Sequence, residues 1–201
     1  MYLLLTDILT CPRCGPQFGL ILLADRIEDR RVLSGRLGCS NCREQYAVEE
    51  GFGVLGRGWA TGAHEPDDEA VMRMAALLGV TEGPGFVLLV GDAAARATAL
   101  ADMVPNLEVI AASDSGREWD ERAGVSRIGI GGTLPFPARA LRGIVLSGRA
   151  ADALLEQAAH ALGVLARLVL EDAPANAAQR LESAGLKVLA QQGSTVVAVR
   201  G

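Results

Sequence analysis

Four cysteines near the start of the chain constrain its fold more than any other feature. They form two C-x-x-C pairs, separated by 24 residues: Cys11 and Cys14, then Cys39 and Cys42. A C-x-x-C pair folds as a tight turn that directs two sulfurs to one point, and two such turns complete the tetrahedron that structural Zn²⁺ prefers. Glycines beside the pairs, Gly15 and Gly38, tolerate the positive φ that such turns often need. The quartet therefore predicts a zinc site.

The segment between the two pairs predicts a β-hairpin. Residues 18–23 and 32–37 are apolar enough for two strands, and residues 25–31 form a polar turn region. A hairpin that joins two cysteine pairs in this way is a zinc ribbon. Because cysteine fills all four ligand positions, no position is open for a reactive water, and the site is structural. Iron also suits tetrahedral sulfur. Four unrelated buried or redox thiols are the alternative without a metal.

Residues 3–55 resemble the small zinc-ribbon proteins that activate RNA and protein methyltransferases. The opening of that family matches residues 4–14, and its closing segment matches residues 37–55, although Ala47 stands where proline is usual. The resemblance implies that apolar strand surface outside the zinc site docks a methyltransferase.

A glycine-rich stretch after the ribbon predicts a domain boundary. We divide the chain into a zinc ribbon at residues 1–58, a linker at 59–66 and an α/β domain at 67–201. We expect Trp59 to be a packing anchor. His64 is expected to be a solvated residue near a helix start, with a ligand or a base as the alternative. The acidic residues that follow it and the apolar spacing up to Gly79 predict a helix.

Strands and helices alternate in the remainder of the chain. Apolar runs predict strands at residues 86–90, 107–112, 125–130, 141–147, 165–170, 186–190 and 195–200, and helices at 93–104, 150–162 and 175–184. This alternation predicts a mostly parallel sheet covered by helices. The last two strands are joined by a tight turn and must therefore be antiparallel. Ligands of such sheets bind at the carboxyl ends of the strands.

This pattern resembles the class I S-adenosylmethionine-dependent methyltransferase fold. Residues 134–137 resemble the Leu-Pro-Phe segment before its fourth strand, and residues 181–188 resemble its last helix-to-strand step. A ribbon and a methyltransferase also occur in one chain in bacterial rRNA guanine methyltransferases. We therefore expect an α/β protein: an N-terminal β zinc ribbon, then a mostly parallel seven-stranded Rossmann-like methyltransferase sheet with a C-terminal antiparallel hairpin.

The resemblance implies a cofactor site at the ends of the first two strands of that sheet, beside Gly91, Asp92, Ser113 and Asp114. The chain departs from the family there. The strand acid and two turn glycines are replaced by Leu89, Ala93 and Ala95, and Ser113 aligns with the acid that binds ribose hydroxyls. A Cβ in the turn obstructs close approach of the backbone to a ligand. The departures disfavour S-adenosylmethionine binding, and Asp92 has the alternative role of a helix cap.

Charge and hydropathy restrict the partners. The net charge of −5 gives no general attraction to nucleic acid. No apolar run reaches the ~18 residues that a membrane-spanning helix needs. The first residues lack the basic flank of a signal peptide, so we expect a reducing cytoplasm. A protein that contacts the ribbon or the α/β surface is the expected partner.

Two functions remain open on these observations. The first is a non-catalytic scaffold or partner subunit with structural Zn²⁺ and a degenerate methyltransferase-like domain. The alternative is an active, divergent S-adenosylmethionine-dependent methyltransferase that acts on RNA, protein or a small molecule. A nucleotide dehydrogenase is a weaker interpretation, because G-x-G-x-x-G is absent. No nucleophile set can be assembled from the remaining residues, so catalytic residues stay unassigned.

Overall fold

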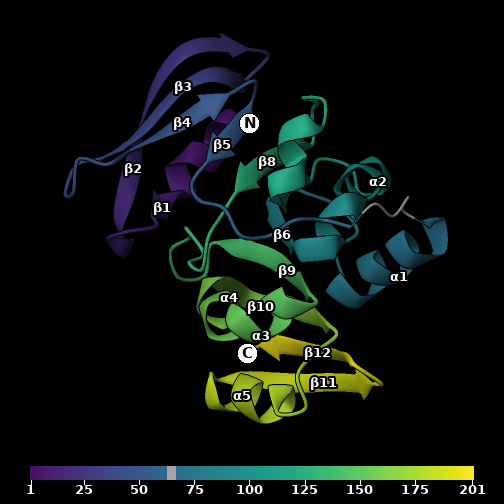
Figure 1. Cartoon of the computed structure of the whole chain (residues 1–201). Coiled ribbons are helices and arrows are strands. Elements are labelled where there is room, and N and C mark those ends of the chain that lie inside the picture. The colour runs from purple at the N-terminus through teal and green to yellow at the C-terminus, as the bar shows by residue number, and fades with distance from the viewer. Residues whose placement is uncertain (63–66) are drawn as a thin grey trace.

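The computed structural model describes residues 1–62 and 67–201 (Figure 1), so the expectation for His64 lies outside the described residues. The ribbon half opens with the 3₁₀ helix η1 (Leu3–Ile8). Five strands follow in antiparallel succession: β1 (Thr10–Cys11), β2 (Gly15–Glu28), β3 (Arg31–Cys39), β4 (Gln45–Glu49) and β5 (Phe52–Val54).

The predicted hairpin is confirmed, with longer strands than expected. β2 and β3 pair as far as Glu28 and Arg31, through most of the residues predicted as a turn. The turn itself is Asp29 and Arg30, whose φ angles are 45° and 62°. Two positive φ angles in a two-residue loop match the twist of antiparallel strands, and aspartate tolerates this conformation well.

Residues 67–201 contain seven strands and five α-helices. The strands are β6 (Phe86–Val90), β7 (Glu108–Ala112), β8 (Val125–Gly129), β9 (Leu141–Ser147), β10 (Leu162–Glu171), β11 (Leu186–Gln192) and β12 (Thr195–Arg200). The helices are α1 (Asp68–Leu78), α2 (Ala97–Met103), α3 (Arg149–Ala153), α4 (Leu155–Ala161) and α5 (Ala177–Ser183). The 3₁₀ helix η2 (Gly91–Arg96) precedes α2, and a break at Leu154 divides the predicted helix 150–162 into α3 and α4.

The strand directions confirm the predicted α/β pattern. Strands β8, β7, β6, β9 and β10 are neighbours in this order, and each pair is parallel. β12 pairs antiparallel with both β10 and β11, which is the predicted closing hairpin. Continuous apolar runs form β6 and most of β7 because both faces of these strands are covered, whereas β8 also buries Ser126 and Arg127.

The sheet corrects one part of the predicted fold, because it does not stop at seven strands. β5 of the ribbon pairs in parallel with β8, with Phe52 opposite Arg127 and Val54 opposite Gly129. The two halves therefore share one mixed sheet of twelve strands (Figure 1). The connection from β7 to β8 holds the short 3₁₀ helix η3 (Asp114–Glu118), and β5 takes the outer edge of β8. An open strand edge readily pairs with another strand.

Two hydrophobic clusters cover the two faces of this sheet. α1 and α2 pack on one face, where Asp67 caps α1 and Gly79 ends it in the left-handed conformation. α3, α4 and α5 pack on the other face. The cluster under α3, α4 and α5 continues into the ribbon through Leu5 and Leu37. The ribbon therefore shares a core with the α/β half. Within the described ranges, no helix is both long and apolar enough to cross a membrane.

A buried ionic network joins the ribbon to the α/β half. Arg31 is 7% exposed and donates to Glu108 at 2.7 Å, to Glu121 at 2.6 Å and to the Val125 carbonyl. Arg127 on β8 donates to the other oxygen of Glu121 at 2.9 Å. Glu121 thus bridges an arginine of the ribbon and an arginine of the parallel sheet. Buried charges require such partners because burial removes them from water.

Candidate functional site

The four cysteines lie at one end of the ribbon hairpin. Cys11 ends β1 and Cys14 lies in the turn before β2, while Cys39 ends β3 and Cys42 lies in the turn before β4. The pairing of β2 with β3 sets Cys39 opposite Leu20, near the first turn. The two turns therefore meet, as the spacing of the pairs predicts.

The backbone of these turns agrees with the sequence prediction in part. Gly15 has a φ of +91°, as expected. Gly38 does not adopt a positive φ, and in the second turn it is Arg43 that does so, at +62°. The Cys39 N–H donates to the Glu44 carbonyl at 2.9 Å, which closes the second turn.

The sulfur positions fit one tetrahedral metal ion. All four Sγ atoms lie within 4.8 Å of one another. Cys11 Sγ and Cys42 Sγ are 3.7 Å apart, and Cys14 Sγ and Cys39 Sγ are 3.9 Å apart. Zn–S bonds of about 2.3 Å in a tetrahedron require sulfurs about 3.8 Å apart. A disulfide requires about 2.05 Å, so these cysteines are not bridged.

The chemistry of the four thiols also fits a cation. Burial raises the pKa of Cys11, but hydrogen bonds from Tyr46 and from the backbone outweigh it and lower the pKa to about 6. A backbone hydrogen bond at Glu44 lowers the pKa of Cys42, but burial and the three neighbouring sulfurs raise it to about 12. Four adjacent sulfurs cannot all ionise without a compensating charge. The four cysteines would hold a divalent ion with no position left for water.

The cofactor residues implied by the methyltransferase resemblance lie at the carboxyl ends of two adjacent parallel strands. Gly91 and Asp92 follow β6, and Ser113 and Asp114 follow β7. Gly91 has a φ of +75°, and a Cβ there would lie 2.9 Å from the Ser147 carbonyl oxygen. Glycine is therefore required at this turn.

Residues 58–62 of the chain itself occupy this edge of the sheet. The Gly58 N–H donates to Asp114 at 2.9 Å, and the Gly62 N–H donates to Asp92 at 2.8 Å. The Thr61 hydroxyl lies 2.5 Å from that of Ser113 and 3.2 Å from the carbonyl oxygen of Gly91. All four residues of the implied cofactor site thus contact one segment. We name residues 58–62 the cleft segment.

Trp59 anchors the cleft segment, as the sequence predicts. Its side chain is buried, and its indole N–H donates to the Gly131 carbonyl at 2.7 Å in the loop after β8. The Arg149 guanidinium lies 5.3 Å from the centre of the ring and also donates to the Gly58 carbonyl at 3.1 Å. Cation–π attraction and hydrogen bonds therefore fix Trp59 and Gly58 in place.

The sequence did not indicate the role of Thr61, Gly58 or Gly62. A glycine-rich stretch is typical of a flexible boundary, and the only local signal was the hydroxyl of Thr61 among the glycines. Asp92 does not cap the following helix, since η2 has no side-chain cap and the Asp92 carboxylate accepts from Gly62.

Comparison with known proteins identifies the fold alone. A scan against protein-family models and a search of curated proteins both find no match. Several of the solved structures that resemble the chain are methyltransferases. The tRNA (m1A58) methyltransferase TrmI of Aquifex aeolicus is 13% identical, with a TM-score of 0.50 over 71% of this chain and 72% of that chain. Geranyl diphosphate methyltransferase in complex with S-adenosylmethionine is 9% identical, with a TM-score of 0.52 over 67% and 85%.

A third similar structure involves an activator protein. It is the complex of the Haloferax volcanii Trm112 methyltransferase activator with a proposed methyltransferase. The identity is 16% and the TM-score is 0.50, over 64% of this chain and 88% of that chain. The α/β half therefore has a methyltransferase-like fold, and the chain adds to it a cysteine cluster with zinc-binding geometry.

Proposed function

We propose that this chain is a non-catalytic scaffold or partner subunit, built from a zinc ribbon and a degenerate methyltransferase-like domain. The observation that carries the proposal is the cleft segment. It hydrogen bonds to each of the four residues at which a methyltransferase of this fold would bind its cofactor: Gly91, Asp92, Ser113 and Asp114.

The cleft segment contacts the residues around the implied cofactor site with an indole, a hydroxyl and two backbone N–H groups. The Trp59 indole donates to the Gly131 carbonyl in the loop after β8. The Thr61 hydroxyl contacts Ser113, which aligns with the residue that binds the ribose. S-adenosylmethionine could enter only after these contacts break. If their loss costs about 3 kcal/mol, the cofactor affinity falls roughly 150-fold.

The ribbon supports the scaffold interpretation because it is bound to its own α/β domain. β5 pairs with β8, and Arg31 joins the two halves through buried ion pairs. The edge of β5 is therefore already paired with β8 and cannot dock a separate methyltransferase chain. The outer side of β2 remains open, and Ile21, Leu23 and Ile27 are about half exposed there. We assign the protein partner to this surface.

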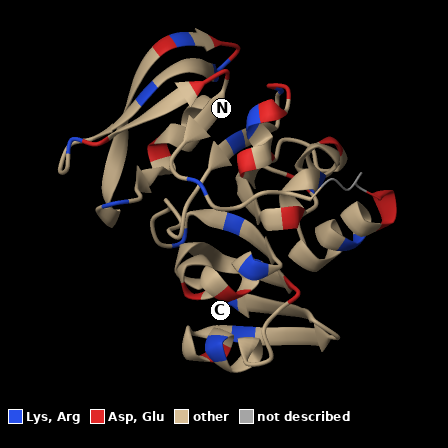
Figure 2. Ribbon diagram, viewed as in Figure 1, with Lys and Arg blue, Asp and Glu red and all other residues tan. Residues whose placement is uncertain are grey.

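Charge and thiol chemistry extend the same proposal. Acidic and basic residues are interspersed in the view of Figure 2, which favours a protein partner over nucleic acid. Cysteines that serve as metal ligands must stay reduced, which supports a cytoplasmic location.

The seven strands β6–β12, in the order β8-β7-β6-β9-β10-β12-β11, support assignment of this half to the class I methyltransferase fold.

Calorimetric titration of the zinc-loaded protein with S-adenosylmethionine and S-adenosylhomocysteine tests the proposal. We expect no binding tighter than about millimolar. Binding at tens of micromolar or tighter would favour the alternative, an active divergent methyltransferase. Trp59→Ala removes the anchor of the cleft segment, and Trp119→Ala is the control, a tryptophan that packs against the other hydrophobic cluster. Tight binding gained only by Trp59→Ala would mean that the site is competent but blocked, which contradicts a degenerate domain.

A further inference from the structure

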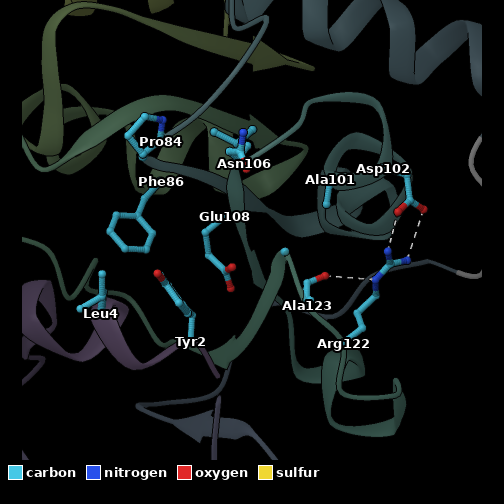
Figure 3. A pocket seen from close by; sticks show the side chains of 13 residues that line it. Tyr2, Leu4, Pro84, Phe86, Ala101, Asp102, Asn106, Glu108, Arg122 and Ala123 are labelled. Carbon is cyan, nitrogen blue, oxygen red and sulfur yellow. Dashed lines mark hydrogen bonds and ion pairs between the residues drawn. The ribbon is translucent and has the colours of Figure 1, made fainter. Parts of the chain in front are cut away.

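A cavity of about 720 Å³ lies at the opposite end of the sheet from the cleft segment (Figure 3). It opens where the amino ends of β6 and β7 meet the first residues of the ribbon. Tyr2 and Phe86 form an aromatic side, and Glu108 and Arg122 belong to a polar side. Its volume is in the usual range for small-molecule sites, roughly 300–1,000 Å³. Neither the zinc cluster nor the methyltransferase resemblance accounts for it.

Glu108 is the polar group that defines this cavity. It is 8% exposed, and Oε1 accepts from Arg31 at 2.7 Å and from the Ser126 hydroxyl at 2.6 Å. Oε2 has no hydrogen bond in residues 1–62 and 67–201. Figure 3 shows the carboxylate pointing from β7 into the space between Tyr2 and Ala123. Oε2 is not among the buried atoms that lack a partner, so it is accessible from the cavity and can accept a hydrogen bond from a ligand there.

The aromatic side indicates the shape of that ligand. The rings of Tyr2 and Phe86 lie 6.4 Å apart at 48°, and Pro84 and Leu4 continue their apolar surface. Flat rings bind such surfaces by stacking and edge-to-face contact.

The charges of the cavity indicate a neutral ligand. Glu108 is paired with Arg31, and Asp102 is paired with Arg122 at 2.5 Å. Every charged side chain that lines the cavity therefore already has a partner of opposite sign. A charged ligand would add an uncompensated charge to this partly buried site, whereas a neutral N–H donor would not.

We propose that this cavity binds a neutral planar heterocycle with an exocyclic amino group. The ring lies against Tyr2 and Phe86, and the amino group donates to Glu108 Oε2. Carboxylates recognise the amino group of cytosine in this way. The same ring chemistry is present in free nucleosides and in single-stranded nucleic acid. The net charge of −5 favours the small molecule.

Titration of the zinc-loaded protein with cytidine and adenosine tests this proposal, by ligand-observed NMR and calorimetry. We expect dissociation constants below about 1 mM. Uridine has a carbonyl where cytidine has the amino group, and should bind at least about tenfold more weakly. Equal binding of uridine, or no binding of cytidine and adenosine at several millimolar, would overturn the proposal. Binding of a cytidine oligonucleotide but not of cytidine would overturn the assignment to a small molecule.

Two variants separate ligand binding from folding. Glu108→Gln replaces the free acceptor and should weaken cytidine at least about tenfold, but it also changes the buried ionic network. Phe86→Leu leaves that network intact and should weaken cytidine by a similar factor, since it removes one aromatic ring. Phe18→Leu in the ribbon is the matched control and should bind as the wild type does. Unchanged affinity in Phe86→Leu, with an unchanged melting temperature, would contradict the proposed site.

Discussion

The buried network at Arg31 predicts a large and specific loss of stability. Arg31→Met keeps the apolar stem of the side chain but removes the guanidinium. Glu108 loses a donor at 2.7 Å and Glu121 loses one at 2.6 Å, and both carboxylates remain largely buried. Removal of one partner from a buried ion pair costs about 3–5 kcal/mol, because the other charge stays buried and uncompensated. For a chain of this length, the melting temperature should fall by roughly 10 °C.

A matched control lies on the same hairpin. Arg26 pairs with Glu28 at 2.6 Å, but the two side chains are 62% and 55% exposed. Arg26→Met should therefore cost at most about 1 kcal/mol. Urea unfolding of the zinc-loaded protein, followed by circular dichroism, gives the free energy of unfolding for each variant. If the two variants differ by less than about 1 kcal/mol, the network does not hold the ribbon to the sheet as argued.

Three further perturbations test other parts of the structure. Metal analysis should find about one Zn²⁺ per chain, and Cys39→Ser should lose the metal and unfold the ribbon, because metal binding supplies folding free energy. Gly91→Ala should cost about 1–3 kcal/mol in urea unfolding, because alanine is strained at a φ of +75°. Burial raises the pKa of Glu121, but ion pairs with the amino terminus and Arg31 outweigh it and hold the pKa below its usual value of 4.5. This stabilisation is complete above pH 4.5 and is lost as the pH falls through the lowered pKa, so Glu121→Gln should flatten the acid side of the pH–stability curve.

A specific result would contradict each of these three predictions. A Cys39→Ser protein with an intact ribbon and wild-type melting temperature would refute the zinc assignment. Gly132 has open space around its Cβ position, so Gly132→Ala is the control for Gly91→Ala, and equal effects would contradict the steric argument. The Glu121 argument fails if the wild type and Glu121→Gln lose stability in parallel between about pH 5 and pH 2.

The metal cluster was the most predictable part of the site, for a local reason. A C-x-x-C pair fixes two sulfurs within four residues, and one hairpin is enough to join two pairs. The apolar runs of β6 and β7 were also predictable from the sequence, since a strand buried on both faces needs apolar residues on both. Helix α1 was predictable because its cap residues, Asp67 and Gly79, are adjacent to it in sequence.

The contacts that the sequence did not indicate join residues far apart in the chain. The pairing of β5 with β8 brings Phe52 to Arg127, and nothing in either segment specifies the other. Arg31 looked like one more residue of a polar turn, yet it is buried against Glu108 and Glu121. Burial of a charge depends on partners that only the folded chain assembles.

The sequence by itself therefore determined the elements: the cysteine cluster, the hairpin, and the alternation of strands and helices. Each follows from local spacing, because periodicity and turn residues act over a few neighbours. Only the tertiary structure decided that ribbon and α/β half form one sheet of twelve strands. It also decided that residues 58–62 contact Gly91, Asp92, Ser113 and Asp114. Glycine-rich chain has little local preference, so its position depends on the groups that it finds at the end of the sheet.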